Sequence, residues 1–215
     1  MTDGSRFKKE RTFWYGVARA AAFLTVRVIA PVRYHHIERI REMSSPAIII
    51  SNHQSALDPL VLGWACPYEI RFLGKRELEG NPVTRYLMDR LHMIPVNRKE
   101  TDLAAMRACV GALKKGAVLG IFPEGTRHLS SLMETVESGV SLLALRSGVP
   151  VLPVYIDGKL RPFHRNHAVI GEYLPYEDLR QQGAGADTAA LLSQRIRETF
   201  YALRDEASRL KSAGE

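Results

Sequence analysis

The stretch Pro46-Ala47-Ile48-Ile49-Ile50-Ser51 decides the fold of this chain. Three consecutive β-branched residues without polar alternation are typical of a strand in a parallel sheet that is covered on both faces. Asp58-Pro59 comes soon afterwards and predicts the start of a helix that runs to Trp64. This part of the chain therefore consists of a buried strand, a short polar loop and a helix.

The same alternation continues along the chain. Further strands are expected over residues 70–73, 93–96, 117–122, 149–156 and 168–170, and further helices over 82–91, 102–115, 139–146 and 188–211. Residues 181–187 are rich in Gly and Ala and predict a loop; their Gly-Ala-Gly-Ala string does not follow a strand of a βαβ unit, so we reject a dinucleotide site there. We predict an α/β fold with a mixed, mostly parallel sheet flanked by helices.

Two of these helices have apolar faces at helical spacing. In the helix expected at 102–115 the shared face carries Leu103, Met106, Val110 and Leu113. In the last helix it carries Leu192, Ile196, Phe200, Leu203, Ala207 and Leu210. A face of this kind predicts docking on the core.

Composition limits the classes of function. The chain has 215 residues, enough for one domain with a substantial core, and a formal net charge of +7. A basic protein is suited to nucleic acid, anionic lipid or phosphorylated small molecules. Nucleic acid is not expected as a partner, because no recognition helix, zinc spacing or basic–aromatic signature is present. Cys66 and Cys109 form no Cys-x-x-Cys pair and are expected to be reduced and partly buried.

Residues 13–30 predict a helix that ends at Pro31, preceded by a basic segment. Arg19 and Arg27 fall on one side of this helix and most of its large apolar residues on the other, which favours a helix that lies on a membrane with its arginines toward the headgroups. The alternative is a helix packed on the core of its own domain. We predict a membrane-docking segment over residues 1–32 and the main domain over 33–215; no cleaved signal peptide is expected.

The string Asn52-His53-Gln54-Ser55-Ala56-Leu57-Asp58 places a histidine five residues before an aspartate, directly after the buried strand. A histidine acts as a base near neutral pH when one ring nitrogen is free and a carboxylate holds the other. His53 and Asp58 can meet if His53 lies in the turn and Asp58 in the first helical turn. The alternative is a loop histidine and a helix-flanking aspartate.

A metal site at these residues would need a third ligand. The candidates are Glu124, His92, His164 and His167, and none stands at a recognisable ligand spacing. No metal is expected.

The string Phe122-Pro123-Glu124-Gly125-Thr126-Arg127 follows another apolar run. Gly125 permits a tight turn or a close approach of a ligand, and Arg127 offers a planar fork of donors that matches phosphate oxygens. Glu124 could hold that arginine or another basic group. The alternative is a surface turn with a local ion pair, worth about 0–1 kcal/mol.

Four blocks in order give the chain a resemblance to a known family. Asn52-His53-x4-Asp58, Gly74–Leu78 with Ile94–Arg98, Phe122–Arg127 and Val149–Val154 are similar to the motifs of the glycerolipid (lysophospholipid) acyltransferases of the 1-acyl-glycerol-3-phosphate acyltransferase type. The resemblance covers roughly residues 45–160. One position departs from the pattern: Glu137 stands where members of the family frequently carry Lys or Arg.

The resemblance implies roles for particular residues. His53 would deprotonate the acceptor hydroxyl and Asp58 would orient His53, with no covalent serine or cysteine intermediate. The acceptor phosphate would be bound by Lys75, Arg98, Glu124, Gly125, Thr126 and Arg127, and Pro153 would line the acyl site. Acyl-CoA or acyl-carrier protein would serve as co-substrate, with no cofactor.

The implied function is transfer of a fatty acyl group from an acyl thioester to the hydroxyl of a lysophospholipid, 1-acyl-sn-glycerol-3-phosphate in the first instance, in phospholipid biosynthesis. The alternatives are an acyltransferase for another lysolipid or polar acceptor, and a catalytically inactive peripheral membrane-binding protein. Membrane lipids are the expected partners, at the cytoplasmic face of the membrane, with peripheral or monotopic attachment. Acyl-chain length, thioester donor, head group and oligomeric state stay open.

Overall fold

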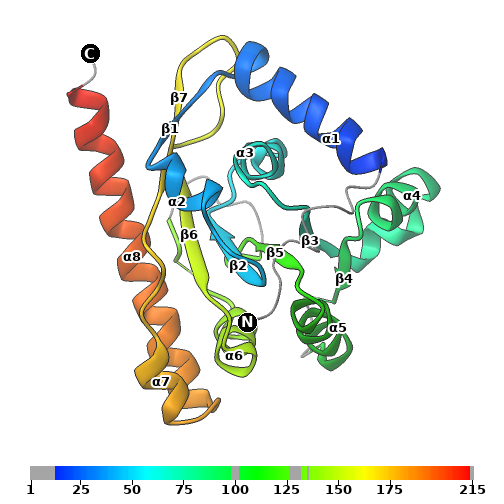
Figure 1. Cartoon of the computed structure of the whole chain (residues 1–215), viewed down its shortest axis with the longest axis vertical. Helices are drawn as coiled ribbons and strands as arrows, with labels where there is room; N and C mark the ends of the chain where they lie inside the picture. The colour runs from blue at the N-terminus through cyan, green and yellow to red at the C-terminus, as the bar shows by residue number, and fades with distance from the viewer. Residues whose placement is uncertain (1–12, 98–101, 126–131, 135, 214–215) are drawn as a thin grey trace.

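A seven-stranded sheet forms the centre of the protein (Figure 1). The structure is a computed structural model that describes residues 13–97, 102–125, 132–134 and 136–213. The strand order is β1-β7-β6-β2-β5-β3-β4, and every neighbouring pair is parallel except β6 and β7. The strands are β1 (Val32–His35), β2 (Ala47–Ser51), β3 (Ile70–Lys75), β4 (Ile94–Val96), β5 (Val118–Ile121), β6 (Val151–Ile156) and β7 (Asn166–Ile170). The predicted mixed, mostly parallel α/β sheet is confirmed.

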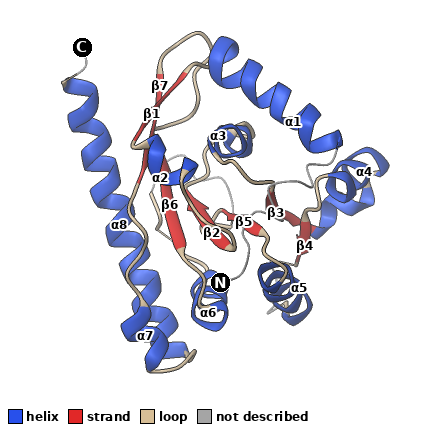
Figure 2. Cartoon of the chain, in the orientation of Figure 1, coloured by secondary structure: helices blue, strands red, loops and turns tan. Residues whose placement is uncertain are grey.

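Helices cover both faces of the sheet (Figure 2). Ile48 and Ile50 of β2 point into the core on one face, while Ile49 packs on the other, because successive side chains of a strand alternate. The first face is covered by α5 (Leu103–Lys114), α6 (Ser138–Ser147) and α8 (Ala186–Ser212). The second is covered by the π-helical turn η2 (Thr25–Ile29), α2 (Ile37–Arg41) and α3 (Asp58–Ala65), and α1 (Phe13–Leu24) packs on α3. The run of isoleucines in β2 thus serves two cores.

The predicted strands and longer helices are present, with ends shifted by a few residues. The elements that the sequence did not indicate are short: β1, α2, η3 (Arg76–Gly80) and α7 (Glu177–Gln181). β1 reads Val-Arg-Tyr-His and forms the edge of the sheet by pairing with the remote strand β7, so no long apolar run marks it. The loop predicted at 181–187 is shorter, because α8 begins at Ala186.

The predicted apolar faces of α5 and α8 both pack on the core, with one exception in α5. In α8 the predicted face docks on the core, with five of its six residues buried and Leu210 packed beside them. In α5 the buried face is carried by Ala105, Cys109, Ala112 and Leu113, while Leu103 is 55 % exposed. Met106 and Val110 also pack against the core, so three of the four predicted residues lie on the docked face and Leu103 does not.

Helix α1 lies across α3 on one side of the molecule (Figure 1) and turns its arginine inward. Arg19 donates hydrogen bonds to the carbonyl oxygens of Cys66 (2.9 Å) and Gly63 (3.3 Å) and stacks over Trp64. The expectation that Arg19 faces lipid headgroups is therefore wrong: the last carbonyls of α3 attract a cation and hold it against the domain. The outward face of α1 carries Phe13, Val17 and Leu24 instead, which are 76 %, 46 % and 50 % exposed.

Within the described residues no helix combines the length and the apolar character that a membrane crossing requires.

A substitution at Gly120 of β5 tests how tightly this strand packs against the side chains of Phe72 and Ile70. A Cβ atom at Gly120 would lie 2.5–2.6 Å from side-chain atoms of Phe72 and Ile70. We expect Gly120→Ala to lower the free energy of unfolding by about 1–3 kcal/mol, because overpacking displaces these side chains. Urea unfolding followed by circular dichroism measures it. The matched control is Gly111→Ala in α5, where a Cβ meets nothing within 4 Å and stability should rise by up to about 1 kcal/mol; equal effects at both glycines would contradict this account.

Candidate active site

The candidate site lies where β2 and β5 end. These strands are parallel neighbours with Ile50 opposite Ile121, so the loops that follow them leave the same edge of the sheet. His53 and Glu124 each come three residues after that pair. The carboxyl edge of such a sheet is where α/β proteins commonly bind ligands. The two strings of the sequence therefore meet in space.

His53 contacts Asp58 as the spacing predicted. Nδ1 of His53 lies 2.9 Å from Oδ2 of Asp58, the first residue of α3. The same oxygen accepts the backbone N–H groups of Gln54 and Ser55, both at 2.8 Å. Asp58 is fully buried, and three donors converging on one oxygen fit an ionised carboxylate. Nδ1 of His53 is then the donor, and no described residue hydrogen-bonds to Nε2.

Asn52 fixes the start of this loop. Its amide nitrogen donates to the carbonyl oxygen of Ile156 and its amide oxygen accepts the N–H of the same residue, both at 2.8 Å. Asn52 thereby extends the pairing of β2 with β6 by one side chain. The sequence interpretation gave this residue no role, although its position directly between the strand and His53 was a usable signal.

Glu124 joins the two loops. One carboxylate oxygen accepts the backbone N–H of His53 at 2.9 Å, and the other accepts the N–H of Met133 at 2.8 Å. The side chain is 4 % exposed. A buried carboxylate with both oxygens occupied by backbone donors is suited to holding the loops in place. Its expected contact with the acceptor phosphate stays a prediction, and the geometry gives it this other task.

Aromatic rings support the imidazole from one side. The ring of His53 stacks on Phe122, with centroids 4.1 Å apart and an angle of 23° between the planes. Phe122 in turn stacks on Phe72 of β3 at 6.0 Å. The rings restrict how far His53 can rotate about its side-chain bonds, so the orientation set by Asp58 is reinforced.

Gly125 has the left-handed conformation that its turn requires, with a φ of 68°. A Cβ atom there would lie 3.1 Å from Oε1 of Glu137, which is the residue before α6. Glu137 is exposed, and its backbone N–H donates to the carbonyl oxygen of Pro123. The residue that departs from the family pattern therefore stands at a helix start and places its carboxylate beside the turn.

The remaining predicted site residues have different positions. Lys75 is exposed at the end of β3, the strand next to β5. Pro153 is buried inside β6, and its ring lies close to Gly171, the residue that follows β7. Arg98, Thr126 and Arg127 lie outside the described residues.

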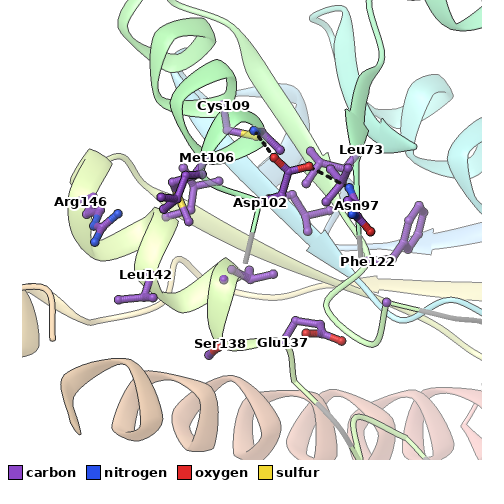
Figure 3. Close-up of a pocket in the computed structure, with 18 residues that line it drawn as sticks. Leu73, Asn97, Asp102, Met106, Cys109, Phe122, Glu137, Ser138, Leu142 and Arg146 are labelled. Atoms are coloured by element: carbon purple, nitrogen blue, oxygen red, sulfur yellow. Dashed lines mark hydrogen bonds between the residues drawn. The ribbon is translucent and has the colours of Figure 1, made fainter. Parts of the chain in front are cut away.

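A cavity of about 560 Å³ opens beside the turn, between α5 and α6 (Figure 3). Most of its lining is apolar, and Phe122 and Gly125 connect it with the His53 loop; the other apolar side chains include Leu73, Val96, Met106, Leu142 and Leu143. Asp102 lies in its wall, where the backbone N–H groups of Ala105 and Asn97 hold the pKa of the carboxyl below its usual range. Burial raises the pKa of the Cys109 thiol to about 11. Pro153 is not among the lining residues.

In the described part of the chain no three His, Cys, Asp or Glu side chains are grouped in a way that could hold a metal ion.

Comparison with known proteins now identifies the class. The model of the Acyltransferase family matches residues 31–157, more than half of the chain and the part that includes His53, Asp58 and Glu124. The chain belongs to this acyltransferase family.

Several relatives have names that specify a reaction. The chain is 27 % identical over 156 residues to a chloroplast 1-acyl-sn-glycerol-3-phosphate acyltransferase of Arabidopsis thaliana, covering 71 % of this chain and 44 % of that protein. Proteins of the same name are 28 % identical in Bacillus subtilis (70 % of this chain, 79 % of that protein) and 37 % identical in Pseudomonas aeruginosa (63 % and 53 %). The chain spans less than half the length of the two plant chloroplast relatives.

A solved structure has the same fold. The crystal structure of the 1-acyl-sn-glycerophosphate (LPA) acyltransferase of Thermotoga maritima matches with a TM-score of 0.69 and 23 % identity, over 98 % of this chain and 84 % of that one. At this level of identity the match supports the architecture of sheet and helices.

Glu124→Gln tests the buried carboxylate that joins the loops. An amide retains one acceptor oxygen and turns an NH2 group toward a backbone donor, so one buried N–H loses its partner. We expect the free energy of unfolding to fall by about 1–3 kcal/mol, measured by urea unfolding. The control is Glu172→Gln, which removes a surface ion pair with Arg39 and should change stability by less than about 1 kcal/mol. A Glu124 variant as stable as wild type would rule out the joining role.

Proposed function

We propose that this chain is an O-acyltransferase that moves a fatty acyl group from an acyl thioester to the hydroxyl of a lysophospholipid, 1-acyl-sn-glycerol-3-phosphate in the first instance. The contact between His53 and the buried Asp58 carries this proposal, because it orients an imidazole with Nε2 available to a ligand. Membership of the acyltransferase family supports the type of reaction, and the names of the relatives support the acceptor.

The reaction needs one base and an activated acyl donor. Nε2 of His53 takes the proton of the acceptor hydroxyl while its oxygen attacks the thioester carbonyl carbon. The new C–O bond forms and the C–S bond breaks, and the imidazolium returns the proton to the departing thiolate sulfur. Asp58 stabilises the imidazolium and keeps Nδ1 protonated before the step.

The acceptor phosphate is assigned to the turn after β5 and its neighbours. Gly125 allows close approach of a ligand to the backbone, and Lys75 projects from the end of the adjacent strand β3. Arg98, Thr126 and Arg127 complete the group through the family resemblance. Arginine binds phosphate with paired donors, whereas lysine acts as a point charge.

The acyl chain is assigned to the cavity between α5 and α6. Its volume of about 560 Å³ falls within the usual range for small-molecule sites, and its apolar lining reaches Phe122, on which His53 stacks. An acyl chain lying there would bring its carbonyl group to the imidazole. This cavity replaces Pro153 as the proposed acyl site.

Helix α1 is proposed to dock on the membrane. Its outward face carries only apolar or small residues, while Arg19 and Tyr15 face the domain. Exposed apolar surface of this kind marks an interaction site, and an interfacial helix buries it among lipid acyl chains. Docking at the cytoplasmic face would place the site where lysophospholipid and acyl-CoA or acyl-carrier protein meet.

His53→Ala should reduce kcat by about 10²- to 10⁴-fold, because the general base is lost. The assay follows thiol release from acyl-CoA with lysophosphatidate as acceptor, and mass spectrometry identifies the product. The control is His92→Asn, an exposed histidine with positive φ that asparagine tolerates. Its activity should match wild type.

Near-normal turnover by His53→Ala would end the base mechanism. A wild-type chain that binds vesicles and releases no thiol would instead identify an inactive membrane-binding protein.

Arg127→Ala should raise the KM for the phosphorylated acceptor by about 10-fold or more with a smaller change in kcat, since a charged hydrogen bond to phosphate contributes about 1.5–3 kcal/mol. The same variant should not change the KM for acyl-CoA. An unchanged acceptor KM would remove Arg127 from the phosphate site.

Glu137→Gln should change the KM for the acceptor in the opposite direction to Arg127→Ala. Its carboxylate lies beside Gly125 and repels an anion there, so its neutralisation should lower the acceptor KM several-fold. A higher KM in this variant would place the phosphate elsewhere.

A further inference from the structure

The loop between β6 and β7 displays an aromatic side chain in solvent. Phe163 is 81 % exposed, and its backbone has a φ of 58°, a conformation that bulky residues rarely adopt. Its N–H donates to the carbonyl oxygen of Ile29 at 2.7 Å, which ties the loop to the end of η2. In Figure 1 this loop lies beside the end of α1 that leads into β1.

Asn166 holds the loop in shape. Its side chain is 4 % exposed; the amide oxygen accepts the N–H of Arg161, and the amide nitrogen donates to the carbonyl oxygens of Arg161, His164 and Pro31. These four hydrogen bonds fix the buried amide and hold the backbone of the loop around it. The exposure of Phe163 is therefore a property of a fixed loop conformation.

The apolar surface continues from this loop onto the helix. Val28 and Ile29 of η2 are 53 % and 37 % exposed, and the outward residues of α1 follow. A backbone hydrogen bond joins Phe163 to Ile29, so the exposed loop and the exposed residues of η2 are neighbours.

The charge around Phe163 has one sign. Lys159, Arg161 and Arg165 are exposed, and the stretch 158–171 contains no Asp or Glu. The nearest carboxylate before it in sequence, Asp157, pairs with Lys211 at 2.7 Å. Arg27 of η2 adds a further exposed cation. An exposed aromatic side chain flanked in sequence by exposed cations complements a surface that is apolar inside and anionic outside.

We propose that loop 159–165 is a second membrane contact, in which Phe163 inserts among the lipids of an anionic bilayer while Lys159, Arg161 and Arg165 meet the phosphate headgroups. The proposal rests on the proposed docking of α1. Apolar insertion and electrostatic attraction to anionic lipid act together in interfacial binding. With α1 as the other contact, the domain could not roll about the helix axis, so its site would keep one orientation toward the bilayer.

The aromatic part is tested by Phe163→Asn, since asparagine tolerates a positive φ. Full-length protein is mixed with vesicles of phosphatidylcholine and phosphatidylglycerol, and bound protein is measured by co-sedimentation. We expect binding about 10-fold weaker than wild type, in line with the loss of one inserted aromatic side chain. The matched control, Leu191→Gln, removes an apolar side chain that is 50 % exposed on α8, and should bind as wild type.

The charged part is tested by combining Arg161→Gln with Arg165→Gln. Binding to the anionic vesicles should fall about 10-fold or more, and the difference from wild type should shrink at high salt or with phosphatidylcholine alone. The control combines Lys114→Gln with Lys115→Gln at the end of α5, which removes the same net charge and should leave binding unchanged.

Three outcomes separate this proposal from the proposed function. Loss of binding in a Val17→Asn, Leu24→Asn variant of α1 but not in Phe163→Asn would overturn the loop contact and leave α1 docking intact. Unchanged vesicle binding with lost binding to an acidic carrier protein in the Arg161 and Arg165 variant would also overturn it. Acyl transfer in detergent micelles should be equal in wild type and Phe163→Asn; absence of transfer in both would refute the catalytic proposal while the vesicle result stood.

Discussion

The parallel pairing of β2 with β5 is the constraint on which the site depends. Ile50 and Ile121 are partners, so equal steps along the two strands bring His53 and Glu124 to the same height above the sheet. A single carboxylate then spans both loops through the backbone N–H groups of His53 and Met133. An antiparallel pair would send these loops to opposite edges, and neither string could complete the other.

Two buried carboxylates organise the site by the same means. Asp58 accepts three N–H donors on one oxygen, and Glu124 accepts one on each oxygen. Removing a carboxylate from water is costly unless hydrogen bonds replace the lost hydration. Backbone amides supply them at both oxygens of Glu124; at Asp58 two backbone amides and the His53 ring supply them to Oδ2, while the buried Oδ1 has no partner among the described residues. Because these donors belong to the loops, the compensation for burial is also what gives the loops their conformation. Asp58 alone reaches the imidazole.

The side proposed to face the membrane has an unusual distribution of charged and apolar residues. Helix α1 places Arg19 against the last carbonyls of α3 and leaves Phe13, Val17 and Leu24 outside. A surface of this composition is unfavourable in water and favourable in a bilayer interface. The basic loop with Phe163 is proposed as a second contact, which would add headgroup attraction and a further inserted side chain to the apolar face of α1.

The sequence by itself determined what depends on short stretches of chain. The isoleucine run of β2 indicated a strand buried on both faces, and the four residues between His53 and Asp58 allowed a contact across one turn. The order of the four blocks indicated the acyltransferase family. The strand and the tight loop could be predicted because each depends mainly on residues that are close together in the sequence.

Only the tertiary structure decided which groups meet across long separations. Arg19 turns inward because α3 ends beneath it, and α5 buries the small residues Ala105, Cys109 and Ala112 while Leu103 is exposed. Glu124 is occupied by the backbone at positions 53 and 133, and a cavity whose lining does not include Pro153 forms between α5 and α6. The side that a helix buries and the partner that a carboxylate finds depend on the packing of remote elements, which local patterns do not encode.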